Sequence, residues 1–506
     1  MKHLTQAESL KIDRSILEKG LIGIERETHR LKEGKISEES HPKVLGNKLY
    51  NQFITTDFAE SQIEFITPPF SDKEDVIRFL HDLNLFFYQN VNESLWPLSM
   101  PPFIENEDSI SLADFGGSNE GLFKNIYRKG LANRYGKYMQ CISGIHYNYS
   151  FSENTFSFLS ENHDLPDDQK FRSDIYFKTM RNINRHNWLL LYFFGASPLV
   201  SENFAQLKDD ISFLRSDAYY LPYATSLRMS DVGYQSANQS KLFVSLNSLD
   251  DYCSDLYNLT SMPFQQYRKL KQESNNEYTQ LNQNLLQIEA EYYTSCRPKP
   301  QSTKGSRLTS ALFKQGVQYI ELRSLDLNPF SMIGIDRITL DFLEIFMIFC
   351  CLDESPFISR KEMIEIKRND LSVAKNGRQL GISIIDKNRE IPLKDAGMRI
   401  LEKMAEISIL LGHEGSLIQK YVSQIHDPSL TLSGRLLDQF RELEGGLDEF
   451  GFKIATTNQK QYLGLDYKVS ENKALIADEA EFSQRHANDL DQNINFNSYL
   501  EAYFKS

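Results

Sequence analysis

The chain has 506 residues, of which 41% are hydrophobic and 25% charged, a balance typical of a large globular protein. Aspartate and glutamate residues number 69 against 56 lysine and arginine residues, which gives a formal net charge of −13. This acidic balance argues against binding to nucleic acid, because contact with the phosphate backbone depends on basic surfaces.

Two strands are predicted near the start of the chain, and both have a polar face that carries carboxylates. Successive side chains of a strand point to opposite faces, so residues 21–28 place Glu25 and Glu27 together, opposite mostly apolar residues. In the same way, residues 61–67 place Glu64 opposite two apolar neighbours. Acidic side chains on apolar strands are therefore the first candidates for a functional site.

A helix and a third strand follow in the chain. Ser71 and Glu74 form a capping-box pattern ahead of apolar residues at helical spacing, which predicts that a helix begins there. Residues 142–149 alternate as a strand, with His146 and Asn148 on one face. We expect this face to be the polar one.

The later part of the chain completes the pattern. Residues 152–168 show no recognisable resemblance to a known sequence and are predicted to form a variable loop. Residues 319–324 form a further strand that places Glu321 and Arg323 on one face, and residues 395–411 have the apolar spacing of a helix.

The predicted strands and helices follow one another without regular alternation, and each strand has one polar face. This favours an antiparallel α+β architecture over a doubly wound parallel sheet.

Location is indicated by the cysteines and the apolar runs. The five cysteines are odd in number and include no C-x-x-C pair, which argues against disulfides or a zinc site and favours a reducing compartment. The first twenty residues lack the apolar core of a signal peptide. The longest apolar run, residues 345–352, is far shorter than the roughly 20 residues that cross a bilayer. We expect a cytoplasmic monomer without a membrane segment.

The acidic strand residues suggest a metal site. One such residue alone can simply face solvent. If Glu25, Glu64 and Glu321 share a sheet, however, their carboxylates repel one another unless a cation neutralises them. Oxygen ligands suit Mg²⁺, or Mn²⁺ as the alternative, and Mg²⁺ commonly bridges carboxylates to substrate phosphates. Arg323 would then supply charge to a transferring phosphoryl group, whereas His146 could equally be a ligand or a structural hydrogen-bonding residue.

Ordered blocks of the sequence resemble the bacterial type 1 glutamate–cysteine ligases. They include Ile-Thr-Thr-Asp-Phe-Ala-Glu at 54–60 and Leu-Pro-Tyr-Ala-Thr-Ser-Leu-Arg at 221–228, together with residues 25–28, 64–68, 96–101, 133–136, 143–148, 194–198, 287–289, 297–299, 321–326 and 427–431. The resemblance extends from about residue 20 to about residue 440. It implies a single catalytic domain over residues 1–506, with a helical C-terminal remainder assigned by continuity.

The resemblance implies a fold and a reaction. The family belongs to the glutamine synthetase-like superfamily, whose antiparallel sheet curls into a funnel with metals at its base. The implied reaction uses ATP and Mg²⁺ to join the γ-carboxyl group of L-glutamate to the amine of L-cysteine through γ-glutamyl phosphate, the first step of glutathione biosynthesis. Two alternatives stay open at this point: a related carboxylate–amine ligase with another amine acceptor, and a metal-binding protein that kept the fold without catalysis.

The resemblance also assigns site residues. Arg323, Glu25 and Glu321 would be catalytic. The metal ligands would be Glu25, Glu27, Asp57, Glu64, His146 and Glu321. The substrates would contact Phe58, Tyr127, Arg128, Leu131, Gln140, Arg228, Tyr234 and Tyr293. From the residues alone, Phe58 and Leu131 would equally suit a core, the tyrosines would suit simple packing, and Arg128 would suit a surface ion pair.

Overall fold

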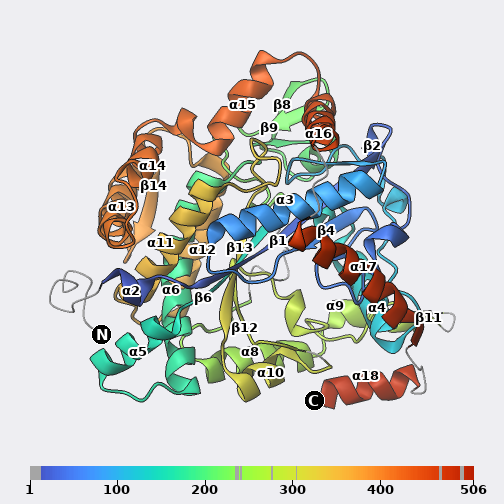
Figure 1. Cartoon of the computed structure of the whole chain (residues 1–506), viewed down its shortest axis with the longest axis horizontal. Helices are drawn as coiled ribbons and strands as arrows, with labels where there is room; N and C mark the ends of the chain where they lie inside the picture. Colours follow the sequence, from blue (N-terminus) through green and yellow to red (C-terminus); the bar gives the residue numbers. More distant parts are fainter. Residues whose placement is uncertain are drawn as a thin grey trace.

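A central antiparallel sheet organises the chain (Figure 1). The computed structural model describes residues 13–233, 239, 242–274, 277–303, 305–465, 470–489 and 495–505. The strand order is β12-β13-β6-β1-β4-β3, and β2 and β5 also pair with β1. This arrangement confirms the predicted antiparallel α+β class. The strands are β1 (Leu21–Lys32), β2 (Lys35–Ile36), β3 (Ile54–Thr56), β4 (Gln62–Ile66), β5 (Ser94–Leu95), β6 (Ile145–Ser150), β12 (Cys296–Lys299) and β13 (Tyr319–Leu325).

The apolar face of this sheet packs against two long helices, α3 (Lys73–Asn90) and α6 (Gln169–Phe194), and a third helix, α11 (Arg337–Leu352), packs against both of them. Strand residues such as Ile22 and Ile24 are fully buried and share one continuous core with the apolar stripes of these helices. Because alternate residues of the strands are buried in this core, the intervening polar residues must point to the opposite face.

Further helices surround the sheet, and smaller sheets lie between them. After Phe440 the described residues are mostly helical: α16 and α17 pack against α3, and α18 lies on α4 (Figure 1). None of the helices in the described residues is both long and apolar enough to span a membrane.

The helices are α2 (Arg14–Leu17), α4 (Asn119–Tyr135), α5 (Glu153–His163), α7 (Glu202–Ala205), α8 (Leu249–Ser261), α9 (Gln265–Arg268), α10 (Leu308–Gln315), α12 (Arg360–Asn376), α13 (Leu393–Leu410), α14 (Ser416–His426), α15 (Leu432–Glu442), α16 (Leu447–Leu463), α17 (Glu471–Asp489) and α18 (Phe496–Lys505). The remaining strands are β7 (Leu199–Val200), β8 (Ser212–Arg215), β9 (Ala218–Tyr220), β10 (Glu273–Ser274), β11 (Glu277–Tyr278), β14 (Ser383–Asp386) and β15 (Arg389–Pro392).

The start of α3 differs from the prediction. The prediction that Ser71 caps this helix is wrong, because the helix begins at Lys73 and Asp72 is its N-cap. Asp72 Oδ1 accepts a hydrogen bond from the backbone N–H of Glu74 at 2.8 Å. The charged carboxylate also interacts favourably with the positive end of the helix dipole, which favours Asp72 over the neighbouring serine.

The predicted variable loop at residues 152–168 is also wrong for most of its length. It contains helix α5, whose N-cap Ser152 accepts a hydrogen bond from the backbone N–H of Thr155. Phe156 and Leu159 pack into the main core from one side of this helix. The helix ends at His163, and its C-cap Asp164 adopts the left-handed conformation with φ of 53°. The apolar spacing within this segment is thus the signal for a helix that the prediction missed.

Candidate active site

The polar faces of the central strands meet at one cavity of about 210 Å³. In the register of the sheet, Glu25 of β1 lies opposite His146 of β6, and Glu27 of β1 lies opposite Glu64 of β4. Strand alternation and antiparallel pairing therefore bring side chains from distant segments to one place. All six predicted metal ligands line this cavity: Glu25, Glu27, Asp57, Glu64, His146 and Glu321.

Carboxylates and one imidazole lie close together in this cavity. His146 Nδ1 is 3.0 Å from Glu25 Oε2, and Asn148 Nδ2 donates to Glu25 Oε1 at 3.0 Å. Glu25, Glu64 and His146 each offer one ligand atom, and these atoms lie within 4.8 Å of one another. Glu27 Oε2 is buried and has no hydrogen-bond partner among the described residues. A buried carboxylate oxygen without a partner is costly, and a bound cation is one way to satisfy it.

Burial and mutual repulsion shift the pKa values of these groups. Burial, reinforced by Asp57, raises the pKa of Glu27 to about 8. Burial raises the pKa of Glu64 well above its ordinary value, with repulsion from Glu25 and Glu27 adding to the shift. Burial lowers the pKa of His146, which favours the neutral imidazole that metals bind. The cluster thus holds protons that a divalent cation could displace.

Glu321 has a different environment from the other acids. Its Oε1 is 2.8 Å from Lys299 Nζ, and its Oε2 is 2.9 Å from Arg323 Nη1 and 3.7 Å from Arg297 Nη1. Burial acts to raise the pKa of Glu321, but Lys299 and then Arg323 outweigh it and hold the pKa well below its usual range. The cavity therefore has an acidic side around Glu64 and a basic side around Glu321.

Arg297 and Lys299 were not among the predicted site residues. Both belong to β12, where they are two residues apart and so share one face of the strand. Arg297 lies opposite Glu321 in the register of β12 and β13. This alternation of two basic residues around a proline was visible in the sequence, but it does not by itself reveal which strand is the partner.

Most of the predicted substrate residues line the same cavity. Gln140 Nε2 donates to the Tyr293 hydroxyl at 2.7 Å, which joins two of them directly. Arg128 Nη2 lies 3.9 Å from Asp57 Oδ1, so its partner belongs to the site and not to the outer surface. Tyr234 lies outside the described residues, and Arg228 does not line this cavity. The predicted substrate residues that line the cavity are Phe58, Tyr127, Arg128, Leu131, Gln140 and Tyr293.

Comparison with known proteins identifies the family. The model of the glutamate–cysteine ligase family matches residues 5–373, which is well over half of the chain. The chain belongs to the glutamate–cysteine ligase family. It is 38% identical to the glutamate–cysteine ligase of Pseudomonas fluorescens (strain Pf0-1), with 94% of this chain and 93% of that protein covered. It is 36% identical to that of Alcanivorax borkumensis over 100% of both chains.

Solved structures agree with this assignment. The crystal structure of the glutamate–cysteine ligase of Francisella tularensis in complex with AMP is 34% identical, with a TM-score of 0.90 over 96% of this chain and 98% of that one. A bifunctional glutathione synthetase from Pasteurella multocida is 27% identical, with a TM-score of 0.71 over 91% of this chain and 55% of that one. The predicted family, glutamine synthetase-like fold and enzyme class are confirmed: this ligase carries out ATP-dependent formation of γ-glutamylcysteine for glutathione biosynthesis.

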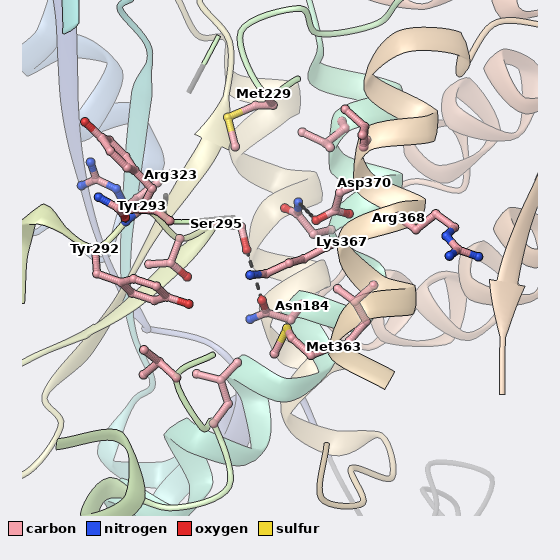
Figure 2. A pocket seen from close by; sticks show the side chains of 18 of the residues that line it. Asn184, Met229, Tyr292, Tyr293, Ser295, Arg323, Met363, Lys367, Arg368 and Asp370 are labelled. Carbon is pink, nitrogen blue, oxygen red and sulfur yellow. Dashed lines mark hydrogen bonds between the residues drawn. The ribbon is translucent and has the colours of Figure 1, made fainter. Parts of the chain in front are cut away.

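A second chamber of the ligase, about 400 Å³ in volume, adjoins the carboxylate cavity (Figure 2). Tyr293 and Arg323 line both spaces. Arg228 lines the second chamber, and its Nη2 donates to the backbone carbonyl of Arg323 at 2.9 Å. A Cβ on Gly144 would lie only 2.2 Å from that nitrogen, so a glycine gives Arg228 the room to reach this position. Arg228 is thus placed to hold the segment that carries Arg323.

The second chamber also contains the carboxyl group of Asp370. Asn187 Nδ2 donates to Asp370 Oδ2 at 2.9 Å, while Oδ1 has no hydrogen-bond partner in the described part of the chain. Burial raises the pKa of Asp370 to about 7. The folded protein therefore retains a proton that the unfolded chain loses near pH 4. Stability consequently falls as the pH rises from about 4 to about 7 and remains lowered above pH 7.

We expect Asp370→Asn to remove this loss of stability. The variant should unfold at a higher temperature than the wild-type ligase at pH 8, with a gain on the order of 2 kcal/mol, and the gain should shrink at pH 5. Differential scanning calorimetry at both pH values measures the difference. A gain of equal size at pH 5 and pH 8, or a loss at pH 8, would contradict the assignment.

Proposed function

We propose that the ligase first transfers the γ-phosphoryl group of ATP to the γ-carboxylate of glutamate, and that the amine of cysteine then displaces phosphate. A free carboxylate is a poor acyl donor, and phosphorylation gives it a leaving group. The observation that carries this proposal is the convergence of buried carboxylates, one with an unpartnered oxygen, beside the cationic group of Lys299 and Arg323. Such a pair of environments suits phosphoryl transfer, in which charge stabilisation and positioning supply most of the catalysis.

The residues present fit a magnesium site. Their donors are mainly carboxylate oxygens, which Mg²⁺ prefers, and the unpartnered Glu27 Oε2 is a position for a ligand bond. When bound, Mg²⁺ or Mn²⁺ would neutralise the phosphate charge of ATP. The proposed ligands are Glu25, Glu27, Asp57, Glu64, His146 and Glu321.

The chain's own residues divide the remaining tasks. Arg323 would contact the transferred phosphoryl group. Glu321 forms ion pairs with both Lys299 and Arg323, so Lys299 and Glu321 would together hold the Arg323 guanidinium in place in the cavity. Gln140 and Tyr293 would form the wall that receives cysteine. A further cavity of about 870 Å³ reaches the cluster at Glu25 and offers room for the nucleotide.

An assay of ADP release with single omissions tests this proposal. We expect full release only when glutamate, cysteine, ATP and Mg²⁺ are all present, and loss of release when a chelator removes the metal. A screen of other amines in place of cysteine tests the acceptor. Full turnover with another amine but not with cysteine would overturn the acceptor assignment, and turnover in excess chelator would overturn the role of the metal.

We also propose that the ligase acts in the cytoplasm as a monomer, with residues 1–506 forming one catalytic domain. All five cysteines are described by the structure, and each is buried and unpaired, which supports a reducing compartment. The net charge of −13 supports the absence of a nucleic-acid partner.

A further inference from the structure

An ion pair that is closed off from solvent lies behind the proposed cysteine pocket. Arg134 is in the last turn of α4, and Glu291 ends the short 3-10 helix η5 (Glu289–Glu291). Arg134 Nη1 lies 3.0 Å from Glu291 Oε1, and both side chains have 0% exposure. Glu291 Oε1 also accepts from the Tyr135 hydroxyl at 2.6 Å, and Oε2 accepts from the backbone N–H of Gln287 at 2.7 Å. Both carboxylate oxygens of Glu291 are therefore hydrogen-bonded to other groups of the protein.

This ion pair joins the two walls of the pocket. One wall is α4, which carries Tyr127 and Leu131 into the cavity, and the other is the segment that ends at Tyr293. The walls pack closely, because a Cβ on Gly130 of α4 would lie 2.0 Å from Gln287 Oε1. Glu291 itself also lines the cavity.

A buried glutamine extends the network to the pocket wall. Gln239 Nε2 donates to the Tyr135 hydroxyl at 3.1 Å and to the carbonyl of Glu291 at 2.9 Å. Gln239 Oε1 accepts from the backbone N–H of Tyr293 at 2.9 Å. A chain of hydrogen bonds thus runs from the Arg134–Glu291 pair to the residue whose hydroxyl accepts from Gln140.

We propose that Glu291 is a positioning residue that sets the width of the cysteine pocket through Arg134, Tyr135 and Gln239. This proposal rests on the proposed function, because it takes the pocket as the acceptor site. Loss of the carboxylate charge leaves the Arg134 guanidinium buried without its counterion, so the contact between the two walls must rearrange. A shift of the wall that holds cysteine weakens its binding, while the carboxylate cluster and the nucleotide cavity lie on other strands.

The chain offers a matched control two residues away. Glu289 is on the same short helix and is equally buried, with Oε1 accepting from Arg307 Nε and from the Thr309 hydroxyl, both at 2.8 Å. It does not line the active-site cavity. Glu289→Gln therefore breaks a buried ion pair of the same kind without touching the pocket.

Steady-state kinetics of the full-length variants Glu291→Gln, Tyr135→Phe and Glu289→Gln, with each substrate varied in turn, test the proposal. We expect KM for cysteine to rise about tenfold in Glu291→Gln and roughly threefold in Tyr135→Phe, which removes the hydroxyl's hydrogen bonds to Glu291 and Gln239 but leaves the ion pair in place. KM for glutamate and for ATP should stay within about twofold of the wild-type values. Glu289→Gln should keep all three values even if its unfolding temperature falls.

Other outcomes would overturn the positioning role. A parallel rise of all three KM values, or the same rise of KM for cysteine in Glu289→Gln, would show that Glu291 has only a structural role. If Glu291→Gln does not fold, an unchanged KM for cysteine in Tyr135→Phe overturns the proposal. Failure of the wild-type ligase to use cysteine would instead overturn the proposed function.

Discussion

Replacing Glu27 with glutamine is expected to lower kcat for ADP formation about a thousandfold. Glutamine keeps the shape of the side chain but cannot supply the negative charge that Glu27, with its unpartnered Oε2, would bring to the site once a cation displaces its proton. The remaining ligands would hold the cation less tightly and with poorer geometry, so the phosphate charge of ATP would be poorly neutralised. Coupled measurement of ADP release at saturating substrates gives kcat.

An exposed carboxylate provides the control for this change. Glu39 forms an exposed ion pair with Lys32 at 2.6 Å and belongs to no part of the site. Glu39→Gln should leave kcat unchanged. Full activity of Glu27→Gln at low Mg²⁺ concentration would remove Glu27 from the metal site.

Replacing Arg323 with alanine is expected to lower kcat by about two to three orders of magnitude, with little effect on KM for cysteine. The alanine variant loses the guanidinium that lies 2.9 Å from Glu321 at the basic side of the cavity. Arg323→Lys should recover only part of the rate, because a lysine ammonium keeps the charge but not the forked donor geometry. Single-turnover formation of ADP measures the step directly.

Arg368 is a matched control for Arg323. It lies at the same chamber on α12 but is exposed, and Figure 2 shows its side chain directed away from Arg323. Arg368→Ala should therefore retain the wild-type kcat. Equal losses in Arg323→Ala and Arg368→Ala would mean that general positive charge, and not a positioned guanidinium, supports the reaction.

Much of the site follows from strand alternation. Glu25, Glu27 and Glu64 could be placed on polar faces because their neighbours are apolar and a strand has a period of two residues. The same logic placed His146 with Asn148 and Glu321 with Arg323, and the structure places each pair in this way. Local pattern was sufficient because each of these strands has only one face toward the core.

Other features depend on contacts between segments that no local pattern reveals. The partners of Glu321 on β12 follow from which strand pairs with β13, and the pairing of Arg134 with Glu291 follows from how α4 packs on the segment before Tyr293. Helix α5 is a different case, because its apolar spacing is a local signal that the prediction did not use. A local pattern can therefore predict which face of an element is polar, but it does not predict which other elements pack against that face.

The stability of the metal-free ligase with and without saturating MgCl₂, measured by calorimetry at pH 8, tests most directly whether the buried carboxylates form one cation site. A ligand that binds only the folded state raises its stability, so Mg²⁺ should raise the unfolding temperature of the wild-type ligase. In Glu27→Gln this rise should be lost or strongly reduced. An equal rise in both proteins, or none in the wild-type ligase, would contradict the account.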